Sequence, residues 1–303
     1  MAARTVLGFQ SSVTGKRWLW IGVCGILLLL AACSAKPGGI IRVALLAPFE
    51  GRYREVGYQA LYAARLAALD FGDASVELLA IDDGGSAASA ADRARALAGD
   101  PLVKAVVALG YAAVAPETQR ALGDTPMIIA GGWGGQPQTD GVFMLASPQL
   151  AQMLTIGARI EVTEAARLEA PLVGGEVFAL EQFIHLRPSP AEVKILSNAA
   201  LPDAAFAERY RQTGLFVPHP GPLATLTYDA FGLLFMAVRS PDENLKVTLS
   251  NITYDGYNGL IRFEDGWWQD APLHYYIYDE ICLERRQQMC LVPASQTPAE
   301  AAP

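Results

Sequence analysis

The cysteines are the side chains with the clearest chemistry in this sequence of 303 residues. Cys282 and Cys290 lie eight positions apart near the end of the chain. In an exported protein two thiols at this spacing can close a small disulfide loop, whereas the alternative is a pair of free thiols without a role. We expect the disulfide. It would hold the last ordered segment in front of a Pro- and Ala-rich stretch, 293–303, whose composition predicts a disordered tail.

The other polar side chains do not form a catalytic pattern. The histidines His185, His219 and His274 are scattered without the spacing of metal ligands or of a Ser-His-Asp triad. The acidic pair Asp82-Asp83 follows an apolar run, where a structural role is the simpler interpretation. Because no nucleophile, base and orienting group occur together, we expect no enzyme activity, no metal and no cofactor.

The first 32 residues have the features of an export signal. Arg4, Lys16 and Arg17 supply a positive start, and the uncharged apolar run 18–32 is shorter than the roughly 20 residues of a membrane-spanning helix. The run ends in Leu30-Ala31-Ala32-Cys33, which resembles the lipobox of bacterial lipoproteins. That resemblance implies cleavage before Cys33 and lipid on this cysteine. The alternative is an uncleaved anchor with an incidental cysteine, and either one places the remaining chain outside the cytoplasm.

The charge of the mature chain excludes one class of partner. Removal of residues 1–32 leaves 20 Lys and Arg against 31 Asp and Glu, a net charge of −11. An acidic surface repels the phosphates of nucleic acids, so we expect no nucleic-acid partner. Contact with the membrane is expected through the lipid on Cys33, and the sequence leaves open whether this is an inner or an outer membrane.

Strands and helices alternate along the first half of the mature chain. Buried apolar runs predict strands over 40–48, 76–81, 105–109 and 127–130, and helical spacing of apolar residues predicts helices over 57–69, 87–98 and 115–122. This order predicts an α/β fold with a parallel, doubly wound sheet. Ligands of such sheets bind beyond the carboxyl ends of the strands, here the loops at 48–51, 82–83, 110–113 and 131–135. None of these loops is a nucleotide-binding motif.

Three separated segments resemble one known family, the type I periplasmic binding proteins, and most of all its branched-chain amino-acid-binding members of ABC importers. The resemblance covers roughly 41–147 and returns over 200–280. The segments that carry it are Ala47-Pro48-Phe49-Glu50-Gly51 with Gly57, Phe206-Ala207-Glu208-Arg209-Tyr210 with the helix 224–231, and Tyr254-Asp255-Gly256-Tyr257-Asn258-Gly259-Leu260-Ile261.

The resemblance implies a fold of two lobes, each a doubly wound parallel sheet, with a hinge between them. The second lobe lacks two strand–helix units that family members have, so we expect it to be truncated. The expected division is a signal peptide 1–32, a tether 33–40, a first lobe 41–147 and 200–265, a shortened second lobe 148–199 and 266–292, and the tail 293–303.

The resemblance also implies a site between the lobes for an amino acid or a similar small polar solute, with an ABC permease as partner. Family members hold the ligand ammonium with an acid of the second lobe, and Glu176 stands at that position. A surface loop glutamate is the alternative. On the carboxylate side Ala112 and Ala113 replace the usual serines, and Gly134 lies near the usual threonine. The complete set of candidate ligand-binding residues is Glu176, Tyr111, Ala112, Gly132, Trp133, Gly134, Tyr53 and Glu50.

Two functions remain open at this point. The first is an extracytoplasmic solute-binding lipoprotein that delivers its ligand to an ABC importer. The second is an envelope lipoprotein that keeps the fold without the ligand and docks a protein partner, which the missing hydroxyls and the shortened lobe favour. For Trp133, packing under its own loop is the alternative to a place in the cleft wall.

Overall fold

The structure is a computed structural model, which describes residues 39–156, 172–186, 193–240, 244–279, 282–283 and 290–294. The chain divides into two compact units at Ile41, and the fold described below belongs to the unit 41–303. The expected signal peptide and Cys33 lie outside the described residues. Within those residues, no helix has both the length and the apolar character that crossing a membrane requires.

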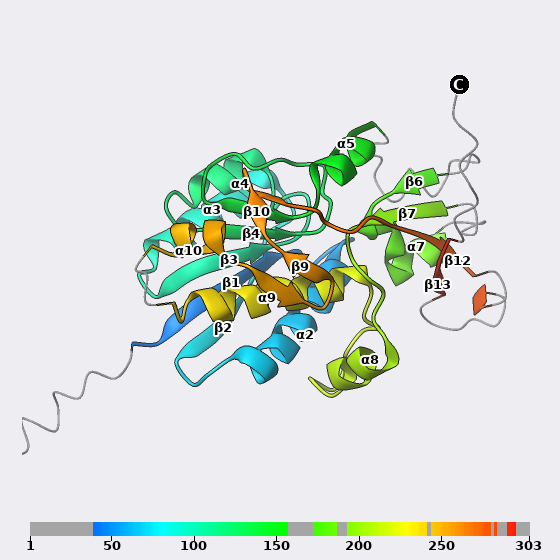
Figure 1. The fold of residues 1–303 in the computed structure, drawn as a ribbon, viewed down its shortest axis with the longest axis horizontal. Helices are drawn as coiled ribbons and strands as arrows, with labels where there is room; N and C mark the ends of the chain where they lie inside the picture. Colours follow the sequence, from blue (N-terminus) through cyan, green and yellow to red (C-terminus); the bar gives the residue numbers. More distant parts are fainter. Residues whose placement is uncertain are drawn as a thin grey trace, which may run out of the picture. The chain divides into compact units, whose positions relative to one another are not determined.

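The larger sheet has seven strands in the order β10-β11-β5-β4-β3-β1-β2 (Figure 1). Six of them are mutually parallel, and β10 alone runs antiparallel to its neighbour. The central strands are buried apolar runs, as a sheet covered on both faces requires. The strands are β1 (Ile41–Ala47), β2 (Val76–Asp82), β3 (Val103–Ala108), β4 (Met127–Ala130), β5 (Val142–Leu145), β10 (Phe263–Glu264) and β11 (Trp267–Trp268).

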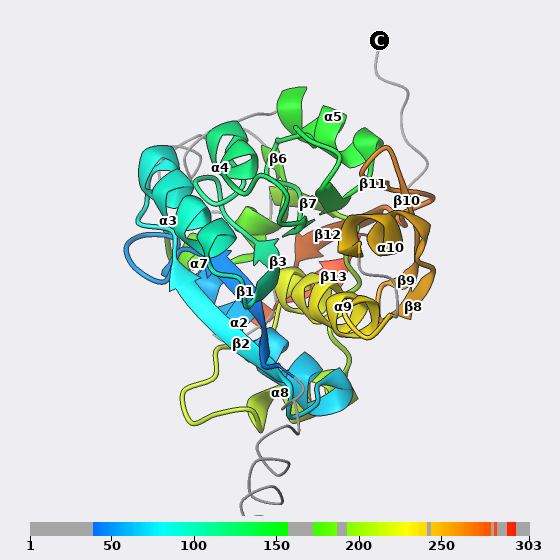
Figure 2. The same cartoon turned by 90° about the vertical axis from the view of Figure 1, so that its left-hand side faces the viewer.

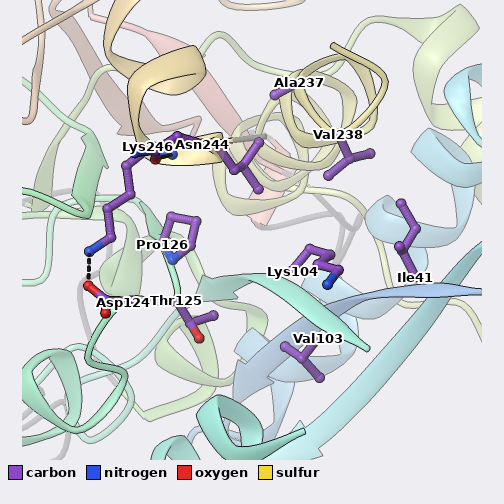
Figure 3. A pocket seen from close by; sticks show the side chains of 11 residues that line it. Ile41, Val103, Lys104, Asp124, Thr125, Pro126, Ala237, Val238, Asn244 and Lys246 are labelled. Atoms are coloured by element: carbon purple, nitrogen blue, oxygen red, sulfur yellow. Dashed lines mark hydrogen bonds and ion pairs between the residues drawn. The ribbon is translucent and has the colours of Figure 1, made fainter. Parts of the chain in front are cut away.

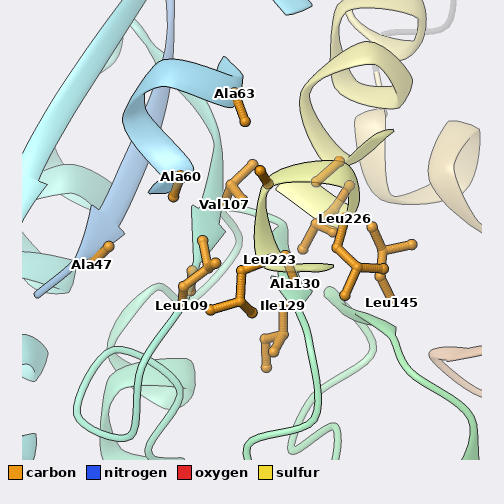
Figure 4. Close-up of a cluster of buried hydrophobic side chains, with 14 of the residues drawn as sticks. Ala47, Ala60, Ala63, Val107, Leu109, Ile129, Ala130, Leu145, Leu223 and Leu226 are labelled. Atoms are coloured by element: carbon orange, nitrogen blue, oxygen red, sulfur yellow. The ribbon is translucent and has the colours of Figure 1, made fainter. Parts of the chain in front are cut away.

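Helices cover both faces of this sheet. On one face α2 (Arg54–Phe71) and α9 (Pro222–Ala237) pack against each other, and both contact the strands. On the other face lie α3 (Ala87–Gly99) and α4 (Pro116–Ala121) (Figure 2). Small residues of α2 such as Ala60 and Ala63 let the helices approach the sheet, and Leu223 and Leu226 of α9 complete the core (Figure 4). The predicted parallel, doubly wound sheet is therefore confirmed in this lobe.

The larger lobe extends beyond the expected limit at residue 265. β11 pairs with β5 in parallel, with Trp267 opposite Met144, and the buried Trp268 indole donates to the Leu260 carbonyl oxygen. The boundary was placed too early because a two-residue strand has no periodicity of its own. The hairpin β8 (Tyr254–Gly256) and β9 (Gly259–Ile261) precedes it, and α10 (Leu245–Asn251) connects it to α9.

The smaller sheet has four strands in the order β13-β12-β7-β6. Its strands are β6 (Leu172–Gly174), β7 (Val193–Ser197), β12 (His274–Tyr278) and β13 (Leu291–Pro293). Only β6 and β7 are parallel, because a helical connection lies between them, η1 (Glu176–Ala179) and α7 (Glu181–Leu186). β12 and β13 add to the sheet antiparallel, so the expectation of a parallel sheet in this lobe is wrong.

The predicted disulfide between Cys282 and Cys290 is confirmed, and it closes the connection from β12 to β13. The expected tail begins too early, because Pro293 belongs to β13 and the Ala294 N–H donates to the Tyr275 carbonyl oxygen. Backbone pairing overrides the Pro- and Ala-rich composition there. An edge strand tolerates proline since one side of its backbone needs no donor.

The chain crosses between the sheets three times, and one buried amide joins the three crossings. Asn198, which follows β7, accepts the Ser147 N–H at 2.8 Å and donates to the Pro272 carbonyl oxygen at 2.6 Å. Ser147 follows β5, and Pro272 precedes β12. Asn198 is fully buried, so its amide satisfies backbone groups that water does not reach.

A buried carboxylate fixes the crossing after β7 to the larger lobe. Asp229 of α9 accepts the N–H groups of Tyr257 and Asn258 and the side-chain amide of Asn258. The Asn258 amide oxygen in turn accepts the Ala200 N–H, in the crossing after β7. Burial outweighs these donors and raises the pKa of Asp229 to about 6.

We predict that Asn198→Ala lowers the free energy of unfolding by about 2 to 4 kcal/mol, because it leaves the buried Ser147 N–H and the partly buried Pro272 carbonyl without partners. Urea denaturation measures the change. The exposed Asn251, whose amide donates to the Val247 carbonyl oxygen, is the matched control. Its change to Ala should cost less than about 0.5 kcal/mol. Equal effects of the two substitutions would show that the hydrogen bonds of Asn198 do not stabilise the crossings.

We also predict that the fold gains stability as the pH falls from 7.5 to 5. The folded-state pKa of Asp229 lies above the usual value for Asp, so the folded chain binds more protons than the unfolded chain between about pH 4 and 6. The gain from this group is about 1.4 kcal/mol over that pH change. Thermal unfolding at both pH values measures it in Asp229→Asn and in the exposed control Asp140→Asn. An Asp229→Asn chain that keeps the full pH difference would contradict the assignment.

Candidate functional site

The candidate site lies where the carboxyl ends of β3 and β4 meet the smaller lobe. The strand order reverses between β1 and β3, which is the point where parallel sheets of this kind bind ligands. The loop after β4 begins with Gly131-Gly132. Gly131 has a φ of +100°, a conformation that side chains disfavour, so glycine is required to turn the backbone here.

Glu176 of the smaller lobe reaches this loop. Its side chain is 2% exposed, its Oε2 accepts the Gly132 N–H at 3.0 Å, and its Oε1 accepts the Ser197 hydroxyl at 2.7 Å. Burial raises the pKa of the Glu176 carboxyl, and the two donors oppose that shift. The alternative of a surface glutamate is therefore wrong. Glu176 is a buried carboxylate that bonds across the two lobes.

The two lobes touch at backbone level beside Glu176. A Cβ atom built on Gly175 would lie 3.2 Å from the Gly132 carbonyl oxygen and 3.1 Å from Leu154 Cδ1 of α5 (Pro148–Ile156). Glycine at position 175 thus permits a contact that a side chain would obstruct. A solute can lie between Glu176 and Gly132 only if the lobes separate.

A second carboxylate, from the larger lobe, accepts hydrogen bonds from the smaller lobe. Glu55, in the first turn of α2, accepts the N–H groups of Glu181 and Gln182 at 2.7 and 3.1 Å. These are the first two residues of α7, whose N–H groups have no partner within the helix. Burial raises the pKa of the Glu55 carboxyl. Each lobe therefore supplies one acid to backbone donors of the other.

Three aromatic rings form a contiguous row over the loops of the larger lobe. Tyr53 meets Tyr111 edge to face at 5.8 Å between ring centroids, and Tyr111 meets Trp133 in the same way at 5.4 Å. Trp133 is 5% exposed and its indole N–H donates to the Ala130 carbonyl oxygen, so it packs under its loop, which was the alternative to the cleft wall. Tyr111 is 37% exposed.

In the described structure, Ala112, Gly134 and Glu50 form no hydrogen bond with Glu176. Ala112 is half-buried and its carbonyl oxygen accepts the Thr118 hydroxyl. Gly134 has a φ of +67° and lies in a turn of its own loop. Glu50 is exposed at the bend after β1. The structure therefore brings together Glu176 with Gly132, and Tyr53 with Tyr111 and Trp133. The two groups adjoin at Gly131, where a Cβ atom would lie 3.3 Å from Trp133 Nε1 and 3.6 Å from Glu176 Oε2.

Sequence reasoning missed Ser197, Asn198 and Glu55. Ser197 and Asn198 stand at the carboxyl end of β7, and recognition of that short strand would have identified them. Glu55 precedes the predicted helix start by two positions, so it was not assigned. Among the described residues no group of three or more His, Cys, Asp or Glu could hold a metal. Asp82 and Asp83 accept N–H groups of their own turn and of Phe49, which is the structural role expected for this pair.

We predict that Glu55→Gln loosens the smaller lobe without unfolding the chain, because a neutral amide is a weaker acceptor for the start of α7 than a carboxylate. Hydrogen exchange at the amides of Glu181 and Gln182 should accelerate several-fold. The exposed Glu117→Gln in α4 is the control and should leave these amides unchanged. Unaltered exchange in Glu55→Gln would show that this bond does not hold the lobes together.

Comparison with known proteins agrees with this geometry at the level of the fold. No family model and no curated protein matches the sequence. The isoleucine complex of the branched-chain amino acid transporter substrate binding protein LivJ from Streptococcus pneumoniae superposes with a TM-score of 0.62, at 16% identity, over 79% of this chain and 96% of that chain.

Two further solved structures agree. The leucine binding protein LivK from Thermotoga maritima has a TM-score of 0.62 at 13% identity, over 84% of this chain and 98% of that one. A solute binding protein of an ABC transporter from R. palustris, in complex with 4-hydroxybenzoate, has a TM-score of 0.62 at 10% identity, over 84% and 95%. The two sheets, the three crossings and these superpositions show that the chain has the fold of the type I periplasmic binding proteins.

Proposed function

We propose that this chain is an extracytoplasmic solute-binding lipoprotein of an ABC importer, which binds an amino acid or a similar small zwitterion between its lobes. The observation that carries the proposal is the Glu176 carboxylate, which is buried between the lobes and bonded to a backbone N–H of the larger one. Solved structures with this fold hold isoleucine and leucine, both of which carry an ammonium and a carboxylate.

A zwitterion can replace the hydrogen bond between Glu176 and Gly132, because it supplies a donor to the carboxylate and an acceptor to the N–H group. When the lobes separate, Glu176 loses a donor and the Gly132 N–H loses an acceptor. The ammonium of an amino acid donates to the Glu176 carboxylate, and its own carboxylate accepts the Gly132 N–H. Hydrogen bonds to charged groups contribute about 1.5 to 3 kcal/mol each, so the two new bonds offset the loss of the direct one.

Ser197 keeps Glu176 in position during this exchange. It lies in β7 of the same lobe as Glu176, so its bond to Oε1 does not depend on closure of the lobes. Oε1 and Oε2 together have room for about four donors, and two are present in the closed form. The carboxylate is therefore held and still able to accept an ammonium group.

A second function is favoured by other observations at the same site. Ala112 and Ala113 offer no hydroxyl to a ligand carboxylate, and the backbones at Gly132 and Gly175 are already in contact. These features suit an envelope lipoprotein whose lobes stay closed and dock a protein partner. Both functions share export and lipid on Cys33, and they differ in whether a solute opens the lobes.

A thermal-shift screen of the mature chain against amino acids and small carboxylates at millimolar concentration separates the two. A ligand present at 100 times its Kd should stabilise the fold by about 2.7 kcal/mol, which is a rise of several degrees in Tm. We predict such a rise with an amino acid, and we predict its loss in Glu176→Gln, where an amide replaces the acceptor of the ammonium.

Glu117→Gln, an exposed change of the same kind, is the control and should keep the rise. A rise that persists in Glu176→Gln would remove Glu176 from the ligand site. Absence of a rise with every ligand, in a chain that unfolds cooperatively, would favour the docking lipoprotein. Intact mass of the membrane-extracted protein tests the lipid on Cys33 separately.

A further inference from the structure

A cavity lies at the opposite edge of the larger sheet from Glu176, where the parallel strands begin. Its volume is about 600 Å³, and Figure 3 shows its walls: Ile41 of β1, Val103 and Lys104 of β3, the loop before β4, the end of α9 and the start of α10. Its lining combines apolar residues with polar ones, and Lys104 is one of the two lysines in it. This edge is far from Glu176, which lies at the carboxyl ends of the same strands.

Among the described residues around this cavity, one cation has no acid as a partner. Four acids at this edge are paired: Asp124 with Lys246 at 3.0 Å, Glu77 and Asp100 with Arg42 at 2.7 and 3.0 Å, and Asp73 with Arg239 at 3.4 Å. The Lys104 ammonium donates to the Pro101 carbonyl oxygen, and no carboxylate of the described chain pairs with it. Two of its three donors remain available to an anion.

Exposed apolar side chains flank the lining residues in the sequence. Leu102 precedes Val103, Val247 follows Lys246, and Met236 precedes the lining residues Ala237 and Val238. Leu69, 74% exposed, lies at the end of α2, whose Phe71 carbonyl oxygen accepts from Arg239 after α9. A cation among exposed aliphatic side chains matches the interface of a phospholipid bilayer, where phosphates lie above acyl chains.

The chain enters the fold at this same edge. β1 begins at Ile41, which lines the cavity, and eight residues, 33–40, separate Ile41 from the end of the expected signal peptide. Eight extended residues reach about 28 Å at most. If Cys33 carries lipid, as proposed above, this edge of the sheet cannot move far from the membrane surface.

We propose that this edge is a membrane-docking face, on which a phospholipid phosphate binds the Lys104 ammonium while Leu69, Leu102 and Val247 enter the interface. Docking gives the anchored protein a fixed orientation on the bilayer. The inference rests on the lipid anchor of the proposed function and on no property of the Glu176 site.

The test uses the full lipidated chain, purified from membranes and reconstituted in vesicles of phosphatidylcholine with or without phosphatidylglycerol. An environment-sensitive fluorophore is attached at Val247→Cys, and at Tyr275→Cys in β12 as the control position. With Cys33 acylated and Cys282 bonded to Cys290, the introduced cysteine is the available thiol. Lipids with a quencher in the acyl chain should quench the probe at 247 and leave the probe at 275 unchanged.

A charge reversal at Lys104 completes the test. Lys104→Glu should shift the balance from docked to undocked at least about fivefold, the effect of one lysine near a lipid surface. Lys194→Glu, an exposed change in β7, should have no effect. Equal quenching at both probe positions, or quenching at 247 that survives Lys104→Glu, would overturn the docking face.

Intact mass separates this inference from the anchor itself. A chain that lacks lipid on Cys33 refutes the anchor, and co-sedimentation of that chain with the same vesicles still decides the docking face. Binding that depends on Lys104 and not on Lys194 would support docking without an anchor, and no binding would reject it.

Discussion

The cost of burying the Glu176 carboxylate is the constraint on which the arrangement of the two lobes depends. A desolvated carboxylate is stable only where hydrogen bonds compensate it, and here one donor comes from each lobe, Ser197 from the smaller and Gly132 from the larger. Closure of the lobes therefore completes a bond set that neither lobe has alone. Glu55 repeats the principle in reverse, since an acid of the larger lobe compensates the exposed donors at the start of α7.

Hydrogen bonds to buried polar groups also stabilise the three crossings between the sheets. The three crossings expose backbone groups that no sheet pairs, and Asn198 satisfies one group on each of the two crossings that flank it. Asp229 and Asn258 extend this network to α9 and to the turn between β8 and β9. The smaller lobe has only four short strands in the described chain, so these polar contacts supply part of the stability that a larger apolar core would otherwise provide.

The sequence predicted the larger lobe well because its strands are buried runs separated by amphipathic helices, and both patterns are local. β4 (Met127–Ala130) has the predicted limits, β1 is shorter than predicted by one residue at each end, and α3 is longer by one residue at its end. The smaller lobe was predicted less well, since strands of three to five residues acquire their structure from partners distant in sequence, as Tyr276 does from Ile195 and Pro293. Family resemblance located Glu176 and the Gly132 loop, whereas the bonds of Glu176 to Gly132 and to Ser197 became evident only in the folded chain.

The hydrogen bonds of Asn198 to the two neighbouring crossings restrict how the two sheets can move relative to each other. Because this one amide bonds to both other crossings, we expect a relative rotation of the two sheets to have its axis close to Asn198 and to carry Glu176 away from Gly132 along an arc. The separation of that pair is then a function of a single angle. A molecule held between the two groups would fix the angle through its own length, so that the protein converts a molecular dimension into a tilt of one lobe against the other.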